Sequence, residues 1–265
     1  MSHHIVEAQN LHFTYPDGTL GIKGISFRIT HGESVAVVGA NGAGKSTLLQ
    51  HLNGYLIPSS GDLRIGDYPL TKKTINEVRR SVGMVFQDPD DQLFMPTVFD
   101  DVAFGPLNLG LPEQDVIQRV NQALETVGMM HVIKRPPYKL SGGEKRSVAI
   151  ATVLAMSPDI LVMDEPSSNL DPLARRRLIG LLKSFHHTKI IATHDLDMAL
   201  ELCERTIVIH GGQITADSAT LDLFQNEQLL KESGLEAPLS MQGCPVCSKT
   251  AKGFQPPTQD HSHTH

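Results

Sequence analysis

The segment SVAVVGANGAGKSTLLQHLNG spans residues 34–54 and contains three patterns in succession. A short Val-rich run comes first, a glycine-rich loop follows, and a helical pattern closes at Gly54. This order predicts the strand, loop and helix of an α/β protein. The loop from Gly39 to Ser46 fits G-x-x-x-x-G-K-[ST] without a gap, a pattern that is typical of phosphate binding.

The residue types of this loop suit a phosphate site. Glycines let the backbone curl until several N–H groups point at one anion, and the following helix presents its positive end to the same place. Lys45 supplies a charge near the terminal phosphates, and the Ser46 hydroxyl can bind Mg²⁺. The glycine order is not G-x-G-x-x-G, which disfavours a nicotinamide site. The alternative is a glycine-rich turn without a ligand.

Two adjacent carboxylates end another apolar run. Asp164 and Glu165 directly follow Ile160–Met163, a predicted buried strand. Ligands of open parallel sheets bind at the carboxyl edge of the strands. We therefore expect Asp164 to hold Mg²⁺ and Glu165 to orient and polarise the attacking water. An acidic strand-to-loop junction without a catalytic role is the alternative.

Two further predicted strands end in polar side chains. Gln87 follows Ser81–Phe86, and His194 follows Lys189–Thr193. The Gln87 amide oxygen can coordinate Mg²⁺ or water, and His194 can hydrogen-bond a terminal phosphate. Either residue alone could be an ordinary strand-end cap. Four strand ends that all suit magnesium and phosphate favour one shared site.

The remaining patterns predict three structural parts. Ile5–Tyr15 and Gly24–Ile29 indicate antiparallel strands, and Thr206–Ile209 with Gln213–Thr215 indicates a closing hairpin. Residues 88–157 are mostly helical in pattern, which predicts a helical subdomain. One apolar helix face is expected there, made of Val116, Ile117, Val120, Ala123, Leu124 and Val127. We assign 1–233 to the folded domain and 234–265 to a flexible tail.

Composition excludes several functional classes. The net charge of −6 disfavours a nucleic-acid partner, and no apolar run approaches the ~20 residues that cross a bilayer. The N-terminus lacks the basic and apolar regions of a signal peptide. We expect a chain that stays in the cytosol and acts on membranes only through partner subunits. Cys203 lies on an apolar helix face, where a buried, inert thiol is expected.

The segment Leu140-Ser-Gly-Gly-Glu144 precedes a helical stretch. Ser141 and Glu144 have the spacing of a capping box. Two glycines at a helix N-terminus also make a second anion cradle. With this motif the chain resembles the nucleotide-binding subunits of ATP-binding cassette (ABC) transporters, in order from about Ile5 to about Phe224.

The resemblance implies an α/β fold: a P-loop NTPase (ABC ATPase) core with an N-terminal antiparallel β subdomain and an inserted helical subdomain. It implies ATP and Mg²⁺ as cofactors, and the absence of an N-K-x-D motif favours ATP over GTP. Ser46, Gln87 and Asp164 would hold Mg²⁺, and Gln87, Glu165 and His194 would be the catalytic set. The nucleotide-binding residues implied are Tyr15, Gly39, Asn41, Gly42, Gly44, Lys45, Ser46, Thr47, Ser141, Gly142 and Gly143, with Tyr15 stacked on adenine. A core aromatic is the alternative for Tyr15.

In this family the signature Leu140–Glu144 of one subunit closes over the ATP held by the other. The resemblance thus implies a second ATPase subunit, expected to form a homodimer, and integral membrane transport subunits. The chain would lie peripherally on the cytoplasmic face of the cell membrane. A soluble ABC ATPase that takes no part in transport is the alternative.

Residues 85–108 indicate which type of ABC cassette the chain resembles. Val85-Phe-Gln-Asp-Pro-Asp-Asp-Gln-Leu-Phe94, with Asp101-Val-Ala-Phe-Gly-Pro106, resembles the cassettes of energy-coupling-factor importers, which include cobalt and nickel systems. The region borders Gln87, where the family's membrane subunit inserts a helix. The alternative is a solvated acidic loop with a buried Phe94.

The last residues give a hint about the substrate. Cys244 and Cys247 form a C-x-x-C pair, and His261, His263 and His265 alternate at the end. Thiolates and imidazoles suit Zn, Co, Ni or Cu(I). One C-x-x-C lacks the second pair of a zinc site, and solvated histidines are the alternative. The tail and the cassette subtype together favour nickel or cobalt import, with vitamin import as the alternative.

Overall fold

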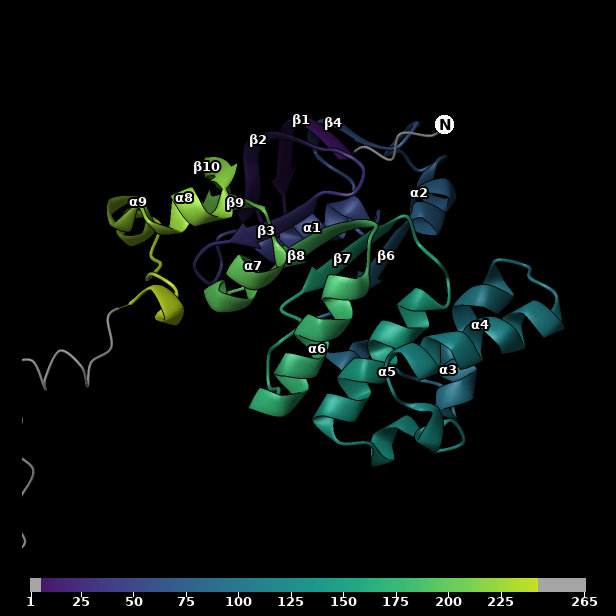
Figure 1. Cartoon of the computed structure of the whole chain (residues 1–265). Coiled ribbons are helices and arrows are strands. Elements are labelled where there is room, and N and C mark those ends of the chain that lie inside the picture. The colour runs from purple at the N-terminus through teal and green to yellow at the C-terminus, as the bar shows by residue number, and fades with distance from the viewer. Residues whose placement is uncertain (1–5, 243–265) are drawn as a thin grey trace, which may run out of the picture.

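The predicted strand, loop and helix lie at the centre of the molecule (Figure 1). The computed structural model describes residues 6–242. In it β3 (Ser34–Val38) is a middle strand of a six-stranded sheet, and α1 (Lys45–Leu52) begins directly after the glycine loop. Val35–Val38 are fully buried because other layers cover both faces of this sheet.

The six-stranded sheet has the order β10-β9-β3-β8-β7-β6. Neighbouring strands from β9 to β6 pair in parallel, and β10 pairs with β9 antiparallel. The predicted closing hairpin is confirmed, and Gly211 and Gly212 both adopt positive φ in its two-residue turn. The strands are β6 (Val82–Val85), β7 (Ile160–Asp164), β8 (Thr188–Ala192), β9 (Arg205–His210) and β10 (Gln213–Ala219).

A four-stranded antiparallel sheet has the order β2-β1-β4-β5. The predicted pairing of β1 (Val6–Thr14) with β2 (Leu20–Ile29) is confirmed. Strands β4 (Ser60–Ile65) and β5 (Tyr68–Pro69) were not predicted. Their sequence is polar, and only Leu63 and Ile65 are buried. Helix α1 packs between the two sheets, because Leu48, Leu49 and Leu52 share one core with both.

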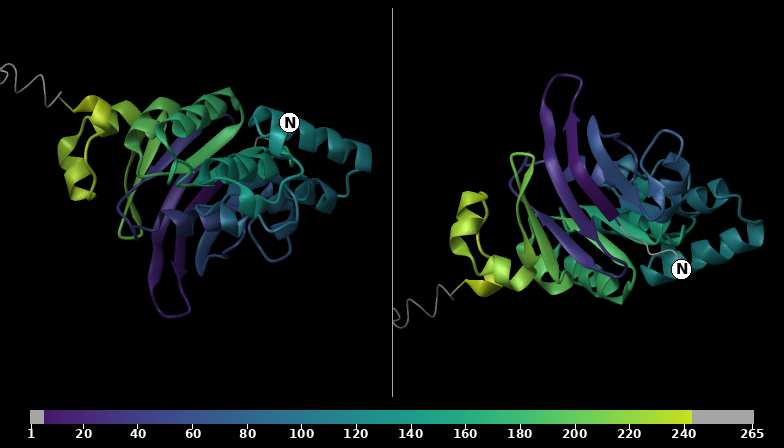
Figure 2. Two further views of the ribbon diagram at one scale, coloured as in Figure 1. Left: turned by 90° about the horizontal axis from the view of Figure 1, so that it is seen from below. Right: turned by 90° about the horizontal axis from the view of Figure 1, so that it is seen from above.

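The helical subdomain is confirmed and lies at one end of the molecule (Figures 1 and 2). It has its own apolar core, and α5 belongs to this core and also to that of the sheet through Ile150 and Val153. Its elements are η1 (Pro89–Asp91), α3 (Val98–Asn108), α4 (Glu113–Thr126), η2 (Met130–Val132), η3 (Pro137–Lys139) and α5 (Gly142–Leu154).

One residue of the apolar face predicted for α4 is placed wrongly. Ile117 is 41% exposed, whereas Val116, Val120, Ala123 and Leu124 are buried. Successive helical residues are about 100° apart. Around the helix axis the buried residues therefore extend from Ala123 to Leu124, with Val120 near the middle, and Ile117 lies just beyond Leu124 at the solvent edge of this stripe.

The second face of the six-stranded sheet is covered by helices from later in the chain. Cys203 is buried there as predicted, and burial raises the pKa of its thiol to about 12. Leu235, Ala237 and Met241 pack against the same core, so the packed region continues beyond residue 233. The remaining helices are α2 (Ile75–Ser81), α6 (Pro172–Ser184), α7 (Leu196–Leu202), α8 (Thr220–Phe224), α9 (Glu227–Glu232) and η4 (Leu239–Met241).

Among residues 6–242, no helix combines the length and the apolar composition that crossing a membrane requires.

We predict that His51 makes the fold sensitive to acid. Its ring is fully buried in α1, Nδ1 lies 2.6 Å from the Thr47 carbonyl oxygen, and burial lowers its pKa below the usual 6.5. The unfolded chain therefore binds a proton at higher pH than the folded chain, and stability is lost as pH falls below about 6.5. Tm measured between pH 7.5 and 5 should fall less for His51→Gln than for the unsubstituted protein.

The exposed His210 provides the control. His210→Gln should keep the pH profile of the unsubstituted protein. Parallel profiles for all three proteins would contradict this role of His51.

Candidate functional site

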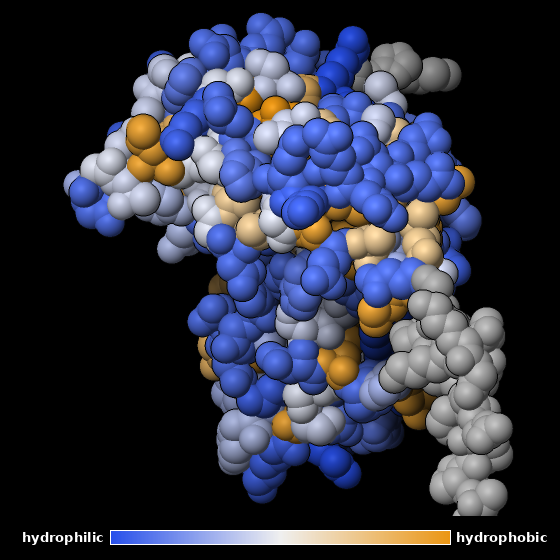
Figure 3. All heavy atoms as spheres, turned by 90° about the vertical axis from the view of Figure 1, so that its left-hand side faces the viewer, coloured by the Kyte–Doolittle hydropathy of each residue, from blue (hydrophilic) through white to orange (hydrophobic). Residues whose placement is uncertain are grey.

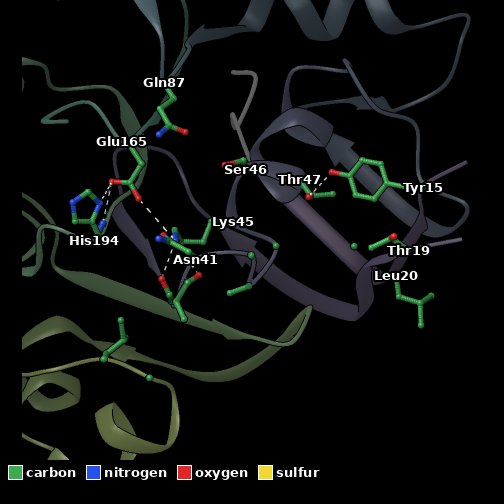
Figure 4. A pocket seen from close by; sticks show the side chains of 18 residues that line it. Tyr15, Thr19, Leu20, Asn41, Lys45, Ser46, Thr47, Gln87, Glu165 and His194 are labelled. Atoms are coloured by element: carbon green, nitrogen blue, oxygen red, sulfur yellow. Dashed lines mark hydrogen bonds and ion pairs between the residues drawn. The ribbon is translucent and has the colours of Figure 1, made fainter. Parts of the chain in front are cut away.

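A cleft of about 850 Å³ lies at the carboxyl edge of the parallel strands (Figure 4). It gathers five of the predicted groups, which come from distant parts of the chain: Tyr15, the loop Gly39–Thr47, Gln87, Glu165 and His194. Parallel pairing explains this meeting, because β3, β6, β7 and β8 all end at the same edge.

Two glycines of the loop are required by close backbone contacts. A Cβ on Gly39 would lie 2.2 Å from the Ile209 carbonyl oxygen, and one on Gly44 would lie 2.8 Å from the Gly21 carbonyl oxygen. Gly44 also has a φ of 109°, in the region that favours glycine. The loop therefore packs its backbone against β9 and β2 and begins α1 at Lys45.

Lys45 is buried at the base of the loop. Its Nζ donates to the Gly39 carbonyl oxygen at 2.8 Å and to that of Ala40 at 3.3 Å. Glu165 Oε1 lies 3.9 Å away on the opposite side. The ammonium is thus held where the loop amides and the helix N-terminus also concentrate positive potential.

Glu165 and His194 form a pair across the ends of β7 and β8 (Figure 4). The Glu165 carboxylate accepts from His194 Nδ1 at 2.7 Å and from the His194 backbone N–H at 3.1 Å. Glu165 has a φ of 46°, which is uncommon for a residue other than glycine, and its N–H is tied to Ala192. Strained backbone held by surrounding bonds is a feature of functional sites.

Asp164 has the environment of a cation ligand. Its side chain is buried, and Oδ1 has no hydrogen-bond partner among the described residues. Burial raises the pKa of Asp164, while the Ser46 hydroxyl acts in the opposite direction. Oxygens from Asp164, Ser46 and Gln87 are the hard ligands that Mg²⁺ prefers. The donor set therefore fits a divalent cation beside the phosphate loop.

Tyr15 lies at the far rim of the cleft from Glu165 (Figure 4). Its hydroxyl is 2.7 Å from Thr47 Oγ1, and its ring packs edge-on against Phe13. The ring is half-buried against the core and also lines the cleft. Stacking on adenine stays a prediction.

The signature residues lie outside the cleft of their own chain. The predicted capping box is confirmed: Ser141 N donates to Glu144 Oε2 at 2.8 Å, and Glu144 N donates to Ser141 Oγ at 3.3 Å. Hydrogen bonding to its carboxylate from the Ser141 backbone, and then from the Ser141 side chain, lowers the pKa of Glu144. Ser141 and Gly142 are exposed at the start of α5. A single chain therefore does not bring Ser141–Gly143 to the phosphate loop.

The alternative of a buried Phe94 is wrong. Phe94 is 63% exposed and packs edge-on against Phe104, whose ring centroid is 5.1 Å away. Phe104 and Leu107 of α3 are also exposed. We call Phe94, Phe104 and Leu107 the aromatic patch. By contrast, the face on the α9 side is mostly hydrophilic (Figure 3).

Sequence reasoning missed several residues at the site. Thr19 at the end of the β1–β2 turn and Leu20 and Gly21 at the start of β2 line the cleft, and Gly234 and Leu235 line it from the C-terminal side. None of them belongs to a motif, and they meet the loop only through tertiary packing. The predicted metal ligands Cys244, Cys247, His261, His263 and His265 lie outside the described residues.

Comparison with known proteins places this site in a family. The family model described as "ABC transporter" matches residues 22–168. The chain belongs to the ABC transporter family. It is 69% identical to a putative ABC transporter ATP-binding protein of Geobacter sulfurreducens, GSU1281, over 94% of this chain and all of that protein.

Two further ABC proteins indicate the type of ABC transporter subunit to which the chain belongs. Identity is 45% to the energy-coupling factor transporter ATP-binding protein EcfA of Methanocaldococcus jannaschii, over 89% of this chain and 86% of EcfA. The solved structure of cbiO1 from Clostridium perfringens, part of the ABC transporter complex cbiONQ, is 40% identical with a TM-score of 0.76. That match covers 87% of this chain and 94% of cbiO1. The chain is thus an ATP-hydrolysing ABC transporter subunit of the energy-coupling-factor type, with the predicted α/β fold.

We predict that Asp164→Asn raises the Mg²⁺ concentration that nucleotide binding requires. An amide in place of the buried carboxylate removes the negative charge that a divalent cation needs at this position. The Mg²⁺ concentration for half-maximal ATP binding should rise by about 10-fold or more, close to the 1.4 kcal/mol that a tenfold change represents. Calorimetric titration of ATP at increasing Mg²⁺ measures this.

The exposed Asp62 supplies a matched control. Asp62→Asn should behave as the unsubstituted protein does. An unchanged Mg²⁺ requirement in Asp164→Asn would exclude Asp164 as a ligand.

Proposed function

We propose that this ABC ATPase energises the import of nickel or cobalt ions, working as one half of an ATP-sandwiched homodimer on the cytoplasmic face of the membrane. The aromatic patch is exposed and follows Gln87 in the chain. It is the main observation that supports coupling to a membrane partner. The resemblance of residues 85–108 to cobalt and nickel cassettes, and the similarity to cbiO1, support the substrate class.

The residues of the cleft divide the chemistry between them. With nucleotide bound, the loop amides and Lys45 would hold the phosphates, and Asp164, Ser46 and Gln87 would hold Mg²⁺. The cation would supply positive charge against the negative charge that develops on the transferred phosphoryl group. Glu165 accepts a hydrogen bond from the attacking water and orients it in line with the leaving group. The 2.7 Å bond from His194 Nδ1 fixes the Glu165 carboxylate and holds the ring at the cleft, where it could reach the terminal phosphate of a bound nucleotide.

The position of the signature supports a dimer. Ser141 and Gly142 are exposed and Gly143 is partly exposed at the N-terminus of a 13-residue helix, where backbone N–H groups and the helix dipole favour an anion. They are absent from the lining of the nucleotide cleft in their own chain. A second copy placed head-to-tail would bring its signature over the phosphate loop and complete two equivalent sites.

The aromatic patch supports docking of a membrane subunit. An edge-to-face pair of exposed phenylalanines is a small apolar surface that a partner helix can cover. Phe94 is held by its backbone, because the N–H groups of Phe94 and Met95 both donate to the buried Asp101 at 3.0 Å. The backbone of this segment is therefore fixed to α3.

We predict that Glu165→Gln keeps nucleotide binding and slows hydrolysis by about 10²- to 10⁴-fold, the usual contribution of a positioned base. The amide preserves the shape of the side chain but can no longer accept a proton. Steady-state phosphate release, with ATP affinity measured in parallel, tests this. The variant should also accumulate as an ATP-bound dimer in gel filtration. Lys45→Ala is the contrasting variant and should lose ATP binding itself.

We predict that replacing both Phe94 and Phe104 by Ser weakens association with the membrane subunits by about 10-fold or more. Burial of one phenylalanine is worth about 1.5–3 kcal/mol, so two exceed the 1.4 kcal/mol of a tenfold change. Copurification of the co-expressed complex measures this. ATP hydrolysis by the isolated chain should change less than about 2-fold. Tyr55→Ser, at another exposed aromatic, is the control, and equal association in all three proteins would contradict the docking role.

Uptake by membranes that contain the complete transporter tests the substrate class. Ni²⁺, Co²⁺ and vitamins are compared in the presence of ATP, with Glu165→Gln as the inactive control. ATP-dependent uptake of Ni²⁺ or Co²⁺ supports the proposal. Uptake of a vitamin alone would assign the alternative substrate, and the absence of any association with membrane subunits would favour an ATPase outside transport.

A further inference from the structure

Arg146 is a buried cation one turn after the signature, on α5. Its guanidinium donates to two neighbouring carbonyl oxygens, that of Phe86 at 2.7 Å and that of Gln87. Its Nε is buried without a hydrogen-bond partner among the described residues. The residue thus joins the helix that starts at the signature to the backbone of Gln87.

A second side chain binds the same backbone. Gln92 Oε1 accepts from the Phe86 N–H at 3.1 Å. Gln92 Nε2 donates to the Ala149 carbonyl oxygen at 2.8 Å and to Thr152 Oγ1 at 2.7 Å, and both of these residues belong to α5. Side chains therefore link both the N–H and the C=O of Phe86 to α5. Arg146 also links the carbonyl oxygen of the next residue, Gln87, to this helix.

Burial of a charge at this position needs a physical reason. A guanidinium costs several kcal/mol to bury, and an apolar side chain would fill the same space without that cost. Burial lowers the pKa of Arg146, while the carboxylates of Asp88 and Asp164 raise it. An arginine has five donors in a rigid fork, so it can satisfy two adjacent carbonyls at once. Lysine has the charge but lacks the planar fork, and glutamine has no charge.

We propose that Arg146 is a positioning residue for Gln87. The hydrogen bonds from its guanidinium fix the backbone that follows β6, so that the Gln87 amide faces the cleft. The position of α5 thereby determines the position of Gln87. The inference rests on the proposed role of Gln87 as a magnesium ligand. Hydrogen bonds from a charged donor are stronger than those from a neutral donor. Their loss leaves the Gln87 backbone free to move relative to the phosphate loop.

The test measures ATP binding to the full chain by calorimetry, at increasing Mg²⁺ and in EDTA. Arg146→Gln should raise the Mg²⁺ concentration for half-maximal binding by about 10-fold and leave binding in EDTA within about 2-fold. Arg146→Lys keeps the charge and can reach one carbonyl, so it should restore part of the loss. Lys145→Gln removes the neighbouring ion pair with Asp90 and should change neither value.

Gln87→Ala and the double variant Gln87→Ala/Arg146→Gln separate the possible outcomes. If Arg146 acts through Gln87, the double variant should need no more Mg²⁺ than Gln87→Ala alone, because contacting residues are not additive. A lower Tm in both Arg146 variants with an unchanged Mg²⁺ requirement would overturn the inference and leave the role of Gln87 intact. An unchanged Mg²⁺ requirement in Gln87→Ala would overturn the ligand role and the inference with it.

Discussion

Parallel pairing of β3, β8, β7 and β6 is the constraint on which the site depends. It brings the glycine loop, Gln87, Glu165 and His194 to one edge, although more than 150 residues separate the first from the last. Parallel strands need helical connections that cover both faces, so the sheet is buried and its edge is rigid. Because the edge is rigid, groups carried by four separate strands keep the spacing that phosphate chemistry requires.

Helix α5 links this edge to the rest of the transporter. Its first turn carries the signature, its second turn holds Phe86 and Gln87 through Arg146, and its later residues pack into two cores. The aromatic patch lies on the next segment along the chain from Gln87. One helix therefore connects the surface expected to meet a second copy, the proposed magnesium ligand Gln87 and the surface expected to meet the membrane subunits.

The sequence predicted the central fold and most of the cleft because those residues have a chemistry that few other patterns share. The glycine loop, the carboxylates after β7 and the capping box at Ser141 are local signals with fixed spacing. Strands β4 and β5 lacked such a signal, because β4 is polar apart from Leu63 and Ile65, and β5 is an edge strand of two residues. The prediction placed Ile117 on the buried face because the apolar pattern in the sequence covers a wider face of the helix than tertiary packing buries. Arg146 lies two residues after the end of the signature, yet only the structure shows which carbonyl oxygens it contacts.

The C-terminal segment determines where the folded ATPase unit ends. Gly234 and Leu235 line the cleft, and Asp197 accepts the N–H groups of Leu239 and Ser240 at 3.0 Å, which fastens this segment to the helix after His194. A shortened protein that stopped at Ser233, where the repeating apolar pattern fades, would open one side of its own catalytic chamber. The smallest unit with a complete chamber therefore extends through Met241.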